Sequence, residues 1–149
     1  MPIKSFRGLI ADGGIDSVPL HTNTGTTGYR IKKLEVMSEK PFFGDISEHC
    51  IKIYTIPQTA VDGEVDFSDQ TLLAVAISTN HTSGWLGPPT PVIIFDNMTF
   101  NQDIYITCND AQGSQAANYY VELEQVKLSL DQNTVATLKD IRNQNPTNL

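Results

Sequence analysis

The chain has 149 residues, 40% of them hydrophobic, which suits one domain that buries a core without metals or disulfides. A formal net charge of −7 argues against a direct nucleic-acid partner, since nucleic-acid binding needs a basic surface. No signal peptide is expected, and no apolar run approaches the ~20 residues that cross a bilayer, so we expect no membrane partner.

Two short strands are predicted at the start of the chain, in residues 4–11 and 16–22. The second is expected at a sheet edge, because Pro19 cannot donate a hydrogen bond within a central ladder. The sequence Asp12-Gly13-Gly14 between them is typical of a tight hairpin turn. The chain is therefore expected to return through this turn into the second strand.

Five further strands are predicted in the middle of the chain, at residues 29–37, 50–56, 72–78, 91–95 and 102–108. In the first of these the apolar phase slips across Lys32 and Lys33, which indicates a β-bulge or a bend between sheets. The apolar run LLAVAIS at 72–78 indicates a strand buried on both faces, with a short helix as the alternative.

The last predicted strand begins at Asn118 and alternates regularly until Glu124-Gln125, where the phase slips by one residue. The slip predicts a β-bulge at that point, or a strand that crosses from one sheet to the other. A short helix is predicted to follow, with Asp131 or Asn133 as its N-terminal cap. Its single apolar stripe consists of Val135, Leu138 and Ile141. This stripe suits either a cap over an open end of the domain or docking on a neighbouring molecule.

About eight strands, one terminal helix and no long helix between strands predict an all-β fold. We expect an antiparallel β-sandwich, jelly-roll-like, with a short C-terminal helix. The sandwich domain would span residues 1–130, and the C-terminal helix and tail residues 131–149.

Few features of the chain suggest a chemical site. The acidic connection at 57–70 has carboxylates at alternate positions, which can bind Ca²⁺, but it lacks the ligand order of an EF-hand and a solvated loop is favoured. The three histidines are not spaced as metal ligands, and no catalytic or phosphate-binding motif occurs. Cys50 and Cys108 are expected to be buried free thiols, because a disulfide would require them to face each other. We predict no cofactor and no metal, with a cupin-like metal site as the remaining alternative.

Two irregular segments carry the candidate contact residues. Trp85, the only tryptophan, lies in a rigid loop, where it can anchor a partner interface, plug one end of the sandwich or stack on a sugar. The complete set of interface candidates is Phe42, Phe43, Trp85, Leu86, Pro88, Val135, Leu138 and Ile141.

Five segments of the chain resemble small proteins encoded among the structural genes of marine tailed phages, cyanophage-like podoviruses in particular. They are residues 1–14, 28–32, 101–107, 119–124 and 134–142. The resemblance extends over nearly the whole chain and is weakest between 38 and 100. It implies a virion component and, for a protein this small, a capsid decoration or cement protein. It assigns no role to any single residue.

We therefore expect a phage virion structural protein, located in the virion, that stabilises the head through protein–protein contacts and has no enzymatic activity. Its expected partners are the major capsid protein or other virion proteins. A homo-oligomer is expected, with a trimer as one option. A tail or neck component is the alternative within the structural class, and a glycan-binding, lectin-like module is the alternative from another class. An enzyme of cupin type is a third.

Overall fold

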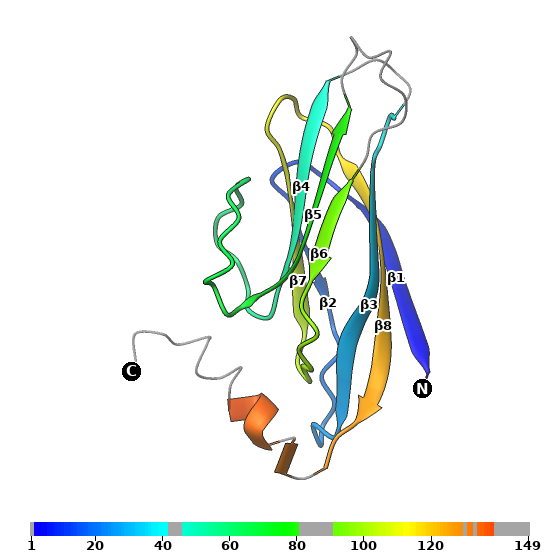
Figure 1. The fold of residues 1–149 in the computed structure, drawn as a ribbon, viewed down its shortest axis with the longest axis vertical. Helices are drawn as coiled ribbons and strands as arrows, with labels where there is room; N and C mark the ends of the chain where they lie inside the picture. Colours follow the sequence, from blue (N-terminus) through cyan, green and yellow to red (C-terminus); the bar gives the residue numbers. More distant parts are fainter. Residues whose placement is uncertain (1, 42–45, 81–90, 130, 133, 139–149) are drawn as a thin grey trace.

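The computed structural model describes residues 2–41, 46–80, 91–129, 131–132 and 134–138. Within these residues the chain forms eight strands in two antiparallel sheets, packed face to face as a sandwich (Figure 1). A short helix follows the last strand, at residues 131–132 and 134–138. The predicted all-β sandwich with a short C-terminal helix is confirmed.

The first sheet has three strands and the second has five. In the first sheet the order is β1 (Ile3–Ile10), β8 (Ala117–Lys127), β3 (Thr27–Ser38). In the second it is β2 (Ile15–Val18), β7 (Ile104–Asp110), β4 (Ser47–Tyr54), β5 (Leu72–Asn80), β6 (Val92–Phe95). The strand β2 lies at a sheet edge, as predicted, but it ends at Val18 and does not continue through Pro19 to residue 22.

The nested pairs β1–β8, β2–β7 and β4–β5 are those of a jelly roll. The strand β6 departs from that scheme, because it pairs with β5 instead of lying beside β3 in the other sheet. The chain then crosses to β3, where Phe100 and Tyr29 exchange two backbone hydrogen bonds of 2.8 and 3.0 Å. This bridge joins the two sheets on the side where β3 and β6 lie.

The core lies between the sheets and follows from the alternation of the strands. Its fully buried members include Ile51, Ile53, Ile104, Ile106, Val121 and Leu123. The strand β5 is buried on both faces from Leu73 to Ala76, as its apolar run predicted. Its outer face is covered because residues 55–71 fold back over the five-stranded sheet, where Lys52 of β4 bonds to this segment.

Register explains why the two cysteines do not pair. Ile51 of β4 lies opposite Cys108 of β7, so Cys108 shares the core face with Ile51. Cys50, one residue earlier, points to the outer face. Both cysteines are buried and free, which confirms that prediction.

The predicted hairpin at Asp12-Gly13-Gly14 is wrong. Gly14 N–H donates to Ala11 O at 2.8 Å, and Gly13 has a φ of 79°, so a tight turn is present. However, β1 pairs with β8 and β2 pairs with β7. The turn therefore carries the chain from one sheet to the other, and its local sequence does not distinguish these two outcomes.

The phase slip in β3 is a β-bulge between Ile31 and Lys33, as predicted. The bulge predicted at Glu124-Gln125 is wrong, because β8 pairs with β3 without interruption through these residues. The next buried apolar side chain after Leu123 is Leu128, and β8 has already ended at Lys127. The change of phase therefore occurs beyond the strand, where no bulge is needed.

The helix is capped by Ser129 and not by Asp131. Ser129 N–H donates to Gln132 Oε1 at 3.0 Å, and Gln132 N–H donates to Ser129 Oγ at 3.3 Å. This is the reciprocal pattern of a capping box. Asn133, the other predicted cap, lies outside the described residues.

Candidate functional surfaces

Six of the eight interface candidates lie outside the described residues: Phe42, Phe43, Trp85, Leu86, Pro88 and Ile141. The strand ends that lead into two of their segments are neighbours, however. Ser47 at the start of β4 pairs with Asn80 at the end of β5. We term this end of the sandwich, marked by Ser38, Ser47 and Asn80, the loop end.

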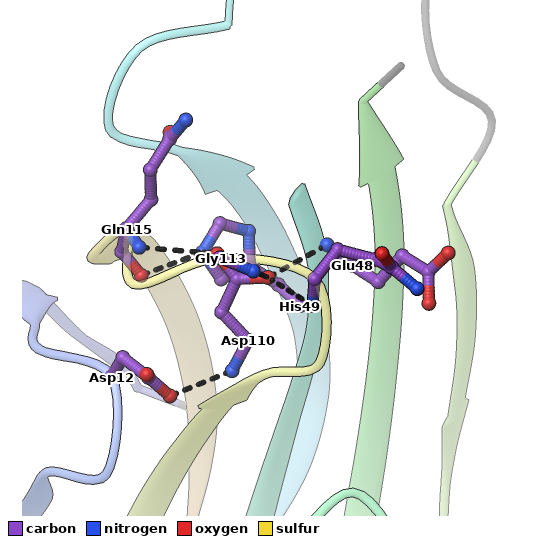
Figure 2. Close-up of polar contacts among 7 residues, drawn as sticks. Asp12, Glu48, His49, Asp110, Gly113 and Gln115 are labelled. Carbon is purple, nitrogen blue, oxygen red and sulfur yellow. Dashed lines mark hydrogen bonds and ion pairs between the residues drawn. The ribbon is translucent and has the colours of Figure 1, made fainter. Parts of the chain in front are cut away.

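A buried carboxylate organises the backbone at the loop end (Figure 2). Asp110 Oδ1 accepts the N–H groups of Glu48, Gln112 and Gly113 at 2.9, 3.1 and 3.1 Å. Its Oδ2 accepts the N–H of Gln115 at 3.1 Å. Asp110 thus joins the start of β4 to the turn between β7 and β8.

The same residue also reaches the first turn of the chain. Asp110 N–H donates to Asp12 Oδ1 at 2.8 Å. Burial of the Asp110 carboxyl opposes its ionisation, but the backbone N–H groups that it accepts outweigh burial and lower its pKa from the ordinary value. Asp110 is therefore held as a carboxylate.

The imidazole of His49 completes this network and is fully buried. Its Nε2 lies 2.9 Å from Gln115 O and must donate, because a carbonyl oxygen only accepts. The same nitrogen is 3.9 Å from Asp110 Oδ2. Its Nδ1 has no partner among the described residues. The bonds of this network go to main-chain groups, so its role is to position backbone.

The acidic segment 57–70 is tied to the sheet by one buried lysine. Lys52 Nζ donates to Asp62 Oδ1 at 2.9 Å and to Glu64 O at 2.7 Å. Burial opposes the charge of Lys52, but its hydrogen bond to Asp62 raises the pKa of the ammonium above the ordinary value. Asp62 therefore balances a lysine, and the described residues contain no cluster of three or more His, Cys, Asp or Glu residues that could hold a metal.

The C-terminal helix contacts the sandwich through threonine and not through its apolar stripe. Asn101 Nδ2 donates to Thr137 Oγ1 at 3.0 Å. Val135 and Leu138, by contrast, are 67% and 60% exposed. The two described members of the stripe are therefore largely exposed, and Leu138 borders a groove between the helix and residues 22–25.

Three features of these surfaces were not predicted. An Asp that precedes a Gly-containing turn is a signal for side-chain capping of the turn, but the sequence does not show which distant N–H groups Asp110 reaches. Lys52 was assigned to a strand without a partner. The apolar residues of β6 suggested a buried strand, whereas Val92, Ile94 and Phe95 are exposed at the sheet edge.

Searches against protein families, curated proteins and solved structures find no match for this chain. Among the described residues, no helix is long and apolar enough to span a bilayer. The class that the described part of the chain defines is an antiparallel β-sandwich, with eight strands in two sheets and nested pairs like those of a jelly roll. A fold by itself does not determine function, so a function has to be inferred from the exposed residues of this sandwich.

Proposed function

We propose that this protein is a structural protein of a phage virion, and that it acts as a capsid decoration protein. The observation that supports this is apolar surface left exposed on three separate elements. Val92 and Ile94 on β6, Val135 and Leu138 on the helix, and Phe67 in the acidic segment are all exposed. Exposed apolar patches mark sites of protein–protein contact. The sequence resemblance to marine tailed-phage structural proteins supplies the virion setting.

A decoration protein acts without turnover. Each copy buries a small surface on the major capsid protein or another virion protein, and many copies add their contributions over the shell. Fully burying a side chain such as Leu138 contributes about 1.5–3 kcal/mol. A short stripe such as Val135 and Leu138 is therefore useful only in combination with a second contact. The loop end, where the segments of Phe42 and Trp85 attach, is the proposed second contact.

Quantitative mass spectrometry of purified virions tests the proposal. A decoration protein is expected at roughly hundreds of copies per particle, because it follows the symmetry of the shell. About a dozen copies would indicate a neck or tail component instead, since those structures follow the symmetry of the tail. Absence from the particle would contradict both.

A binding experiment then tests the surface. The double variant Val135→Ser/Leu138→Ser is expected to bind stripped capsids more weakly than the native protein in co-sedimentation. The matched control is Asp131→Ser, which changes an exposed residue of the same helix and leaves its apolar stripe intact. Equal binding by both variants would remove the helix from the proposed contact.

A further inference from the structure

The strand β1 is a free edge of the three-stranded sheet. It pairs with β8 along its whole length and without a register shift. No other described strand pairs with it, and it is the outermost strand of its sheet in Figure 1. Gln125 N–H donates to Pro2 O at 2.9 Å, so the even-numbered residues of β1 bond to β8. The main-chain N–H and C=O groups of the odd-numbered residues therefore point away from the sheet: Ile3, Ser5, Arg7 and Leu9.

The other three sheet edges are protected in ways that β1 is not. The strands β2 and β6 have only four residues each, and short edges pair poorly with other strands. The strand β3 is interrupted by its bulge and bridged to Phe100. By contrast, β1 is a regular strand of eight residues, in which Ile3 and Leu9 are 51% and 52% exposed. A long, regular edge with apolar side chains pairs readily with another strand.

The β1 strand of a second copy satisfies the free main-chain groups in one register. In an antiparallel pair about a two-fold axis, Ile3 lies opposite Leu9 of the second copy. Ser5 then lies opposite Arg7, and all four odd-numbered residues exchange main-chain hydrogen bonds. A slip of two residues one way places Arg7 opposite Arg7, and a slip the other way places it opposite Ile3. Both slips leave main-chain groups without partners, so the symmetric register is favoured.

The outward side chains match in this register. Ile3 of one copy contacts Leu9 of the other, which pairs two exposed apolar side chains across the strands. Ser5 lies opposite Glu122 of its own β8, so Arg7 of one copy, Ser5 of the other and Glu122 of the other form one cross-strand row. Ser5 is small and leaves the Arg7 guanidinium within reach of that carboxylate. The contact therefore pairs opposite charges across the interface.

The core-side residues of β1 also suit this pairing. Phe6, which packs against the core, lies on the two-fold axis opposite Phe6 of the second copy, as an aromatic cross-strand pair. Lys4 lies opposite Gly8, whose lack of a side chain leaves room for the lysine stem. A groove of about 480 Å³ runs along this side, lined by Lys4, Ser5, Phe6, Tyr29 and residues 19–22. The edge is therefore open to an incoming strand.

We propose that the protein forms a two-fold symmetric dimer through β1, in which two three-stranded sheets join into one continuous antiparallel sheet. Its strand order is β3-β8-β1 followed by β1-β8-β3 of the second copy. Such an interface is isologous, so it closes at the dimer and leaves no β1 edge free for further association. This inference goes beyond the proposed function and does not depend on it.

A proline at Ser5 tests the main-chain pairing. Because the Ser5 N–H points away from β8, Ser5→Pro removes an interface donor and leaves the ladder with β8 intact. Sedimentation velocity over a concentration series is expected to show a monomer–dimer equilibrium for the native protein. Ser5→Pro is expected to raise the dissociation constant by at least about tenfold. The matched control, Ser5→Thr, keeps the N–H and is expected to leave the constant unchanged.

A cysteine pair tests the register without a proline. An equimolar mixture of Ser5→Cys and Arg7→Cys copies is expected to form a disulfide-linked dimer under mild oxidation, because these positions lie opposite each other. Either variant alone is expected to stay unlinked, since neither position lies opposite itself. The native Cys50 and Cys108 are buried in every copy and serve as a common background.

Several outcomes would overturn the dimer. A native protein that stays monomeric throughout the series does so, and it leaves the β1 edge to a strand of another protein. A dimer that Ser5→Pro weakens no more than Ser5→Thr does so as well, provided that circular dichroism shows both variants folded. Cross-linking in a single variant as complete as in the mixture contradicts the register. These measurements are independent of virion composition, so a virion protein that stays monomeric refutes this inference alone.

Discussion

Asp110 shows how a single buried side chain can define the end of a β-sandwich. Turns at sandwich ends leave backbone N–H groups that no strand partner satisfies. Asp110 accepts four of these groups, from Glu48, Gln112, Gly113 and Gln115. A carboxylate suits the position because both oxygens only accept, so every approaching N–H finds an acceptor.

Asp110→Asn tests this role at nearly constant volume. The amide nitrogen would present donors toward backbone N–H groups, so buried donors would lose their acceptor. We expect the free energy of unfolding to fall by about 2–4 kcal/mol in denaturant titrations. Asp131→Asn, at an exposed position, is the control and is expected to change it little. Similar losses in both variants would contradict the assignment.

The lowered pKa of Asp110 also predicts how stability depends on pH. An unfolded-state aspartate titrates near pH ~3.9. Because the folded-state pKa lies below this value, the stabilisation is fully present above pH ~4 and is lost as the pH falls through the folded-state pKa. Thermal unfolding between neutral and acidic pH should show this loss, and Asp110→Asn should reduce its slope. An unchanged slope in the variant would assign the acid sensitivity to other carboxyls.

At the scale of elements, each strand was predictable from its own residues, but its partners were not. The apolar run of β5 and the bulge at Lys32-Lys33 are local patterns, and both were predicted correctly. After the turn at Gly13, β2 joins the five-stranded sheet and does not pair with β1. This pairing and the exposed edge position of β6 depend on residues far away in the chain. The Ser129 cap was predictable, since Ser-x-x-Gln is a capping-box sequence.

The candidate site was less predictable than the strands, for the same reason. Val135 and Leu138 were identified from helical spacing, but their exposure depends on how Thr137 of the helix contacts Asn101 of the sandwich. The groove that Leu9 and Met37 line exists because β1, β3 and β8 meet in one sheet. No local window of the sequence contains that information.

Residues 57–70, which lie over the five-stranded sheet, are held there by Lys52. Lys52→Met keeps most of the apolar stem but removes the donor to Asp62 and Glu64. We expect residues 57–70 to exchange amide hydrogens faster and to be cut sooner in limited proteolysis, because few other polar contacts tie this segment to β4. Lys127→Met, on β8, is the control. Unchanged exchange within 57–70 would show that packing alone holds the segment.

At the scale of the whole molecule, contacts between distant parts of the chain dominate. Ile3 pairs with Glu124, and Ile15 pairs with Thr107. Folds built from such non-local pairings reach the native state in roughly milliseconds to seconds. Stopped-flow refolding monitored by Trp85 fluorescence is expected to fall in this range. Refolding within microseconds would contradict the dependence on these pairings.

The central position of β8 has a consequence for synthesis. The strands β1 and β3 flank β8 and do not pair with each other, yet β8 is the last of the eight strands to leave the ribosome. Until then, two edges rich in apolar residues have no native partner, while β4, β5 and β7 can already associate. A nascent chain therefore leaves its three-stranded sheet unpaired until β8 has been synthesised. A cell that makes many copies at once would expose those unpaired strands to one another, so the rate at which β8 emerges sets the time available for misassembly.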